Sequence, residues 1–185
     1  TYKTQSRIIL AITASINALV GGIIGINQTH LRPLLAYSSI GHIGWITSIL
    51  SINKSSFCII YFIIYSLIVI PIFLMINIIN SKTIKTIYNI FKINTVTAII
   101  IAVCLLSLAG IPPLTGFIPK LIIIFKLIET NYVILIFLLI GAYINLYYYL
   151  NITFNLIMRR TNMSYKYKDR YNYNLPTTVI LSTSI

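Results

Sequence analysis

The sequence predicts an all-α integral membrane protein, a polytopic bundle of transmembrane helices in which one helix is discontinuous. Hydrophobic residues make up 58% of the 185 residues and charged residues only 9%, whereas soluble domains carry roughly a quarter charged residues. A bilayer-spanning helix needs about 20 apolar residues. Four long stretches contain no Asp, Glu, Lys or Arg, namely 33–53, 55–81, 93–119 and 130–158. The third stretch contains two adjacent prolines, which interrupt a helix.

We expect a single transmembrane domain over residues 1–185, with five spans and part of a sixth. The spans are expected at about 8–26, 34–50, 57–79, 96–128 (broken near 110–116), 131–158 and from 177 onward. Pro71 lies inside the third span, where proline usually causes a kink that transmembrane helices tolerate. Residues 177–185 are too few to cross a membrane on their own.

Charged residues separate these spans in chain order. Arg7 precedes the first span, Arg32 the second and Lys54 the third, while Glu129 stands at the turn between the fourth and the fifth. A basic loop at 159–174 follows the fifth span. Charges in these places lie where a membrane protein meets water.

The charge balance is strongly basic, with 14 Lys and Arg against two acidic residues and a net charge of +12. Because the cations fall between apolar runs, they favour one membrane topology, and we expect contact with lipids and no binding of nucleic acid. The segment 82–94 spaces Ile84, Ile87, Tyr88 and Phe91 at helical intervals. It fits either an amphipathic helix on the membrane surface or an ordinary basic loop.

The fourth span is too long for one straight helix, because residues 96–128 would cover about 50 Å against about 30 Å of hydrocarbon. Pro112 and Pro113 remove two backbone donors and disfavour helix before them. Gly110 and Gly116 permit backbone angles that other residues resist. We therefore predict two half-helices joined by a short non-helical stretch.

Lys120 follows this break and is the strongest candidate for a functional site. Pro119 leaves a further acceptor free, and the hydroxyl of Thr115 is a candidate to hold water. Unpaired backbone at membrane depth is tolerated against protein or water, and transporters use such breaks to line ion sites. A lysine there is a candidate proton-relay group. The alternative is that its amine snorkels to the membrane interface.

His42 is a second candidate proton-relay group, about 12 Å into the second span. Ser38 lies four residues earlier and shares its helix face. The alternative is a neutral histidine whose hydrogen bonds are satisfied by a neighbouring helix. Glu129 is either a proton exit group or a solvated helix end, and its place at the end of a span favours the second reading.

Three segments resemble a known family. They are "GINQTHLRPLLAYSSIGHIGW" (25–45), "SLAGIPPLTGFIPK" (107–120) and "YLNITF" (149–154). They look like the subunit 2 family of NADH dehydrogenases, which are antiporter-like membrane subunits of respiratory complex I. The resemblance covers roughly residues 15–160.

This resemblance implies two inverted five-helix repeats, each with a broken helix, and a line of buried charged residues joined by water. Lys120 matches the lysine on the broken helix of the second repeat. His42 follows the family's "YSSI" motif, near the central axis, with Tyr37 and Ser38 as supporting residues. Two departures stand out: Pro33 replaces a basic residue, and the family's first half has no counterpart in this sequence.

The resemblance implies a proton-translocating subunit of mitochondrial complex I in the inner membrane, the second half of a split subunit. This chain would be part of an enzyme without performing redox chemistry, so we expect no cofactor on it, with NADH, FMN, iron–sulfur clusters and ubiquinone bound by other subunits. Expected partners are other membrane-arm subunits and a second polypeptide that supplies the first half. The alternatives are a scaffold subunit without its own proton path and a subunit of a cation/proton antiporter.

Overall fold

The computed structural model of the chain describes residues 2–53, 55–79, 84 and 95–158. The helices are α1 (Tyr2–Ile26), α2 (Leu31–Ser51), α3 (Ser55–Ile79), α5 (Thr95–Ala109), α6 (Phe117–Thr130) and α7 (Tyr132–Met158). No strand occurs among the described residues, and the predicted all-α class is confirmed. Apart from Ile84, the predicted surface segment 82–94 lies outside the described residues, as do the basic loop 159–174 and the partial last span.

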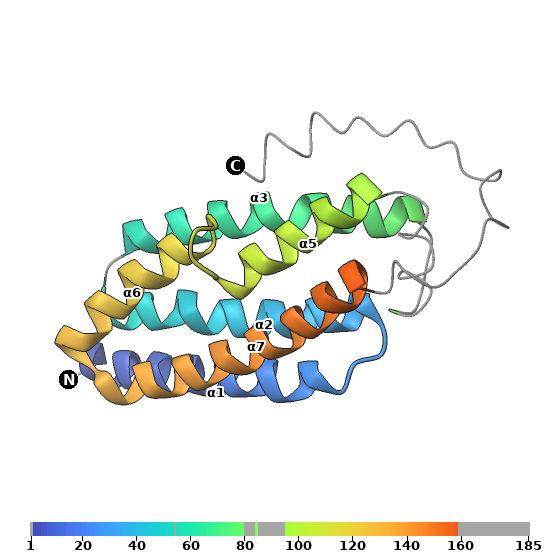
Figure 1. The fold of residues 1–185 in the computed structure, drawn as a ribbon. Helices are drawn as coiled ribbons and strands as arrows, with labels where there is room; N and C mark the ends of the chain where they lie inside the picture. The colour runs from blue at the N-terminus through green and yellow to red at the C-terminus, as the bar shows by residue number, and fades with distance from the viewer. Residues whose placement is uncertain (1, 54, 80–83, 85–94, 159–185) are drawn as a thin grey trace, which may run out of the picture.

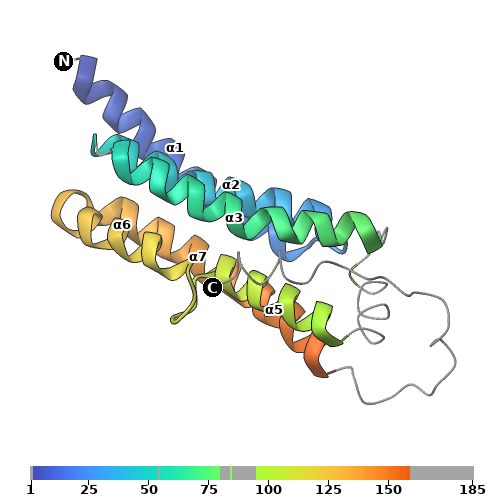
Figure 2. The ribbon, with the colours of Figure 1, turned by 90° about the horizontal axis from the view of Figure 1, so that it is seen from above.

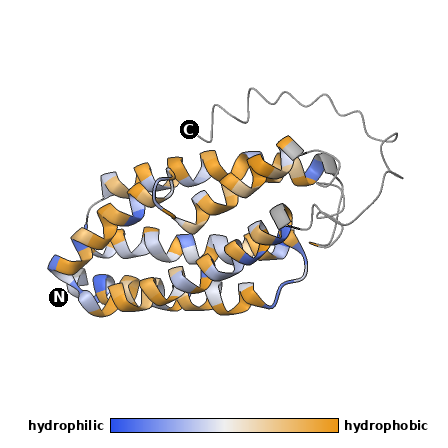
Figure 3. Cartoon of the chain, viewed as in Figure 1, coloured by the Kyte–Doolittle hydropathy of each residue, from blue (hydrophilic) through white to orange (hydrophobic). Residues whose placement is uncertain are grey.

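Length and composition single out three described helices as able to cross a membrane, namely α1, α3 and α7. α5 is apolar but shorter, as expected for half of a broken span. α2 is 21 residues long, but its serines and His42 make it less apolar, so its crossing of the membrane stays a prediction. Figure 3 shows hydrophobic colours over most of the helical surface and hydrophilic colours mainly near helix ends and turns.

The helices form two rows, α1–α2–α3 and α5–α6–α7 (Figure 2). The N-terminus of α1 lies at the same end of the bundle as the turn between α6 and α7 (Figure 1). α1 packs mainly against α2 and α7, whereas α5 packs against α7 and α3. α5 and α6 lie one after the other along the bundle and together run beside the length of α7 (Figures 1 and 2).

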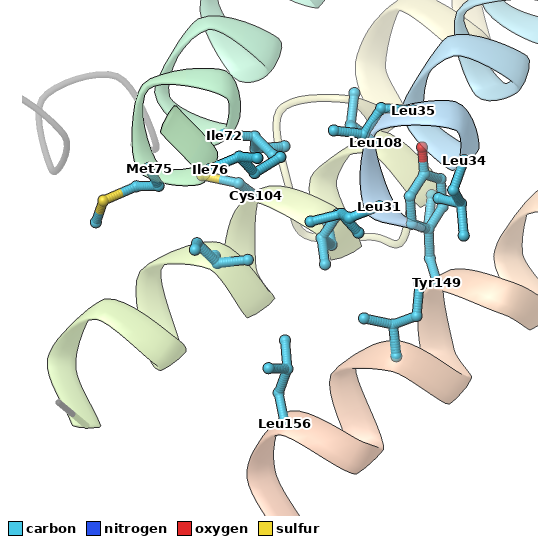
Figure 4. Close-up of a cluster of buried hydrophobic side chains, with 14 of the residues drawn as sticks. Leu31, Leu34, Leu35, Ile72, Met75, Ile76, Cys104, Leu108, Tyr149 and Leu156 are labelled. Atoms are coloured by element: carbon cyan, nitrogen blue, oxygen red, sulfur yellow. The ribbon is translucent and has the colours of Figure 1, made fainter. Parts of the chain in front are cut away.

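One hydrophobic cluster occupies the half of the bundle around α5 (Figure 4). Tyr149 extends from α7 toward Leu34 of α2 in this cluster and is fully buried. Leu105 of α5 is also fully buried. In lipid the hydrophobic effect does not drive helices together, because the lipid tails are as apolar as the side chains. Burial of such side chains therefore stabilises the helix packing through dispersion contacts.

Small residues bring α1, α2 and α7 into direct backbone contact. A Cβ atom added to Gly21 would lie 2.6 Å from the amide nitrogen of Gly41, and one added to Gly44 would lie 3.0 Å from the amide nitrogen of Ala18. A Cβ atom on Gly141 of α7 would lie 2.5 Å from the Ala18 carbonyl oxygen. Close packing through small residues is the usual way in which transmembrane helices associate.

Candidate functional site at the helix break

The interruption between α5 and α6 lies where the paired prolines predict a break. α5 ends at Ala109 and α6 begins at Phe117. Gly110 adopts φ +81°, in the left-handed region that favours glycine. Its amide donates back to the carbonyls of Leu106 and Ser107, at 3.2 and 3.0 Å, which closes the end of α5. The connecting residues form turns until the Phe117 amide reaches the Leu114 carbonyl, at 3.0 Å.

Lys120 reaches back across this break to the end of α5. Its side chain is only 6% exposed. The Nζ atom donates to the carbonyl oxygens of Leu108 at 2.9 Å and Ala109 at 2.8 Å. The last carbonyls of a helix have no partner within it, and the helix dipole makes that end negative. The lysine amine therefore caps the C-terminal end of the neighbouring half-helix, a geometry that differs from snorkelling toward water.

Ser107 fixes the two half-helices relative to each other, and sequence reasoning did not single it out. Its hydroxyl lies 3.1 Å from the Thr115 hydroxyl and accepts a hydrogen bond from the Gly116 amide at 3.2 Å. A Cβ atom on Gly116 would overlap the Ser107 carbonyl. The start of α6 thus rests directly on the last turn of α5, which holds Lys120 in reach of its two carbonyls.

The other predicted residues of the break fall into two groups. Pro119 is buried in the first turn of α6, whereas Pro112 and Pro113 are exposed. Thr115 is half-buried and hydrogen-bonds Ser107, so its role as a water ligand stays a prediction.

His42 lies on α2 and is held by two tyrosines of α3. Its ring is 4% exposed. The Nδ1 atom and the Tyr61 hydroxyl lie 2.8 Å apart and share a hydrogen bond. The Tyr65 ring packs against the imidazole with centroids 4.8 Å apart. The Nε2 atom is buried and has no hydrogen-bond partner among the described residues.

A small cavity joins His42 to the helix break. Its volume is about 10 Å³ and its lining includes His42, Tyr61, Ser107, Gly116 and Pro119. Leu108, whose carbonyl binds Lys120, also lines it. The structure therefore brings His42 and the break, which are far apart in the sequence, to the lining of one cavity.

Three other residues predicted for the site do not line this cavity. Ser38 is 1% exposed, but its hydroxyl donates to the Leu35 carbonyl of its own helix at 2.8 Å. Tyr37 is half-buried. Glu129 has a 66% exposed side chain and pairs with Lys126 at 3.5 Å, which fits a solvated helix end.

Metal-binding side chains do not cluster in the described part of the chain. Within residues 2–53, 55–79, 84 and 95–158, no group of three His, Cys, Asp or Glu side chains is placed to hold a metal ion. Cys58 is half-buried, Cys104 is buried, and both are free thiols. The expectation that cofactors bind other subunits stays a prediction.

Comparison with known proteins decides the family. The model of the family described as "NADH:quinone oxidoreductase/Mrp antiporter, TM" matches residues 1–145. The chain belongs to this family. Its break and buried lysine are thus features of a member of the NADH:quinone oxidoreductase/Mrp antiporter family.

Two curated relatives of this antiporter-family chain share the name NADH-ubiquinone oxidoreductase chain 2. NADH-ubiquinone oxidoreductase chain 2 of Lumbricus terrestris is 43% identical over 139 residues, which cover 75% of this chain and 42% of the relative. Chain 2 of Bos taurus is 34% identical over 183 residues, covering 94% of this chain and 52% of the relative. The chain therefore spans about half the length of the curated relatives it matches.

A solved structure shares the fold. A chain of respiratory complex I from Thermus thermophilus with bound aureothin superimposes with a TM-score of 0.78 and 22% sequence identity. The match covers 95% of this chain and 40% of that chain. At this identity the likeness shows the fold alone, an antiporter-type helical membrane fold.

Proposed function

We propose that this chain is a proton-translocating, antiporter-like subunit of mitochondrial complex I, NADH:ubiquinone oxidoreductase, in the inner membrane. One observation supports it above the others: Lys120 is buried in a broken helix with its amine on the carbonyls of Leu108 and Ala109. Family membership and the name shared by the relatives support the assignment to complex I.

The geometry suits a proton relay because the two protonation states of Lys120 would bind the break differently. A charged lysine at membrane depth costs about 2.5–3.5 kcal/mol on insertion scales, and the two carbonyls offset part of that cost. An ammonium has three N–H donors, and two of them are engaged. The third is free to pass a proton to water, and loss of that proton weakens the contact with α5.

The redox chemistry of the complex takes place elsewhere in this proposal. NADH, FMN, iron–sulfur clusters and ubiquinone bind other subunits, while this chain contacts membrane-arm subunits and lipids. The half of the relatives' length that this sequence does not match packs against it, supplied by a second polypeptide. A polar break is tolerated at membrane depth only where protein or water covers it, which supports this arrangement.

Substitution of Lys120 in the native complex tests the proposal. Lys120→Met removes the titrating amine, and Lys120→Arg keeps a positive charge that is not released as a proton. We expect both variants to lower coupled NADH oxidation and proton translocation in sealed vesicles by about tenfold or more. Lys126→Met is the matched control, because Lys126 lies on the same helix with a 43% exposed side chain, and we expect its rate within about twofold of wild type.

Two results would reject the proton-translocating role. An unaltered rate together with an unaltered proton-to-electron ratio in Lys120→Met indicates a scaffold subunit. If Lys120→Arg keeps wild-type activity while Lys120→Met loses it, the site needs only a fixed positive charge and no proton release. Sensitivity of NADH oxidation to ubiquinone-site inhibitors in the purified complex distinguishes complex I from a cation/proton antiporter.

A further inference from the structure

The tyrosine that holds His42 takes no part in the proton relay proposed for Lys120. Tyr61 lies on α3 and is 3% exposed, and its hydroxyl shares a 2.8 Å hydrogen bond with His42 Nδ1. Tyr65, one turn later, packs its ring against the same imidazole with centroids 4.8 Å apart. Of these two tyrosines, Tyr61 therefore makes the polar contact and Tyr65 the apolar one.

The contact with Tyr61 determines which nitrogen of His42 remains available. A neutral imidazole has one donor nitrogen and one acceptor nitrogen, and a tyrosine hydroxyl can pair with either kind, so the contact occupies Nδ1 in both tautomers. With Nδ1 engaged by Tyr61, Nε2 is left to interact with the rest of the site. Nε2 is buried without a protein partner among the described residues, although buried polar atoms nearly always have one.

The helix break contributes a matching polar group to the same cavity. His42 and Ser107 both line this cavity of about 10 Å³, and that volume is close to the smallest that holds one water. The Ser107 hydroxyl already contacts Thr115 and Gly116. A hydroxyl has one donor and two acceptor positions, so one position remains open whichever of Ser107 and Thr115 donates to the other.

We propose that Tyr61 is a positioning residue for His42. Its hydroxyl fixes the ring through Nδ1, so that Nε2 binds a single buried water that bridges α2 to Ser107 at the break. Water suits this place because it is small and can either donate a hydrogen bond to Nε2 or accept one from it. It therefore fits both tautomers of His42. The inference rests on the proposed function, since it describes how His42 joins the site of Lys120.

A matched pair of variants in the native complex tests this role. Tyr61→Phe and Tyr65→Phe each remove one hydroxyl from neighbouring turns of α3 and keep the ring. We expect Tyr61→Phe to lower proton translocation about threefold to tenfold, as for the loss of one buried hydrogen bond, with the amount of assembled complex unchanged. Tyr65→Phe should stay within about twofold of wild type. In a His42→Ala background, Tyr61→Phe should cause no further loss, because the two residues act as a unit.

Two readouts report on His42 directly. Infrared difference spectra with labelled histidine should show ring bands of His42, assigned by their loss in His42→Ala, that shift in Tyr61→Phe because Nδ1 loses its hydrogen bond. A density map of the wild-type complex that shows ordered waters should contain one water within hydrogen-bond distance of Nε2. This second measurement tests both the water at Nε2 and the contact of Tyr61 with Nδ1, even if the Tyr61 variant fails to assemble.

Several outcomes would overturn the proposal: equal losses in the two tyrosine variants, an additive loss in the His42→Ala background, unchanged His42 bands in Tyr61→Phe, or a protein group bound to Nε2. Its failure is distinguishable from that of the proposed function. If Lys120→Met leaves proton translocation unchanged, the function is wrong, yet the water and the His42 bands still show whether Tyr61 positions His42.

Discussion

Pro71 and the Pro112–Pro113 pair each interrupt a long apolar stretch of this chain, with opposite results. Pro71 lies within α3, which continues unbroken from Ser55 to Ile79. Pro112 and Pro113 lie between α5 and α6, where the helix stops and restarts. One proline removes one hydrogen bond, which a membrane helix tolerates. The break needs more: two prolines, glycines on either side, and polar groups that satisfy the freed backbone.

Those polar groups are the main difference between the two regions. At the break, Lys120 binds the final carbonyls of α5 and the Ser107 hydroxyl accepts from the Gly116 amide. A stable break in an apolar helix therefore depends on its polar partners as much as on its prolines. Substitutions of the partners should therefore have larger effects than substitution of Pro71.

The largest effect is expected for Gly116→Ala. Its Cβ atom would overlap the Ser107 carbonyl, and neither backbone can move without separating α5 from α6. We expect destabilisation of about 3 kcal/mol or more, seen as loss of assembled complex on native gels. In the control Gly25→Ala, the new atom meets only the Tyr148 ring edge at 3.1 Å. Equal losses in the two variants would contradict the contact described at the break.

A smaller loss is expected for Ser107→Ala. The change leaves the buried Gly116 amide and the Thr115 hydroxyl without their partner, which costs about 1–3 kcal/mol. Thermal inactivation of the purified complex should shift to lower temperature. Ser66→Ala is the control, because the Ser66 hydroxyl is exposed and donates to Ile63 within its own helix. A shift of the same size in both variants would show that Ser107 does not hold the break.

Pro71→Ala should change stability by less than about 1 kcal/mol. Alanine restores a backbone donor to α3 and has a higher helix propensity, but Pro71 is buried and the smaller side chain leaves a void. The two effects oppose each other. Circular dichroism and thermal inactivation of the variant complex measure the balance. A loss as large as that of Gly116→Ala would mean that the proline in α3 is as essential as the break.

The smallest effect is expected for Glu129→Gln. The carboxylate is 66% exposed and its pair with Lys126 spans 3.5 Å, so the loss should be less than about 0.5 kcal/mol. Proton translocation should stay within about twofold of wild type. A tenfold drop in that rate would instead assign Glu129 to the proton path.

The parts of the site that the sequence predicts are those whose effect is confined to neighbouring residues of the chain. Paired prolines and flanking glycines act on their own backbone, so the break and its lysine stand out without knowledge of the packing. Tyr61 and Ser107 did not stand out, because their partners lie on other elements. α3 is apolar on all sides, and its sequence therefore does not show which face is buried. The hydrogen bond from Tyr61 to His42 depends on the rotation of two helices about their axes.

Helix ends were predicted only approximately. α1 begins at Tyr2 and α6 continues to Thr130, beyond the predicted starts and ends at 8 and 128. Charged and polar residues mark the limits of an apolar span, yet a helix can continue past them where it leaves the membrane.

The contact of α1, α2 and α7 through glycine and alanine has a mechanical consequence. Where backbones touch, as at Gly21 and Gly41, no layer of side chains can change rotamer to permit sliding, and packed interiors deform little. These three helices therefore pack as one stiff unit of the chain, and α5 and α6, the two halves of the break, lie outside it.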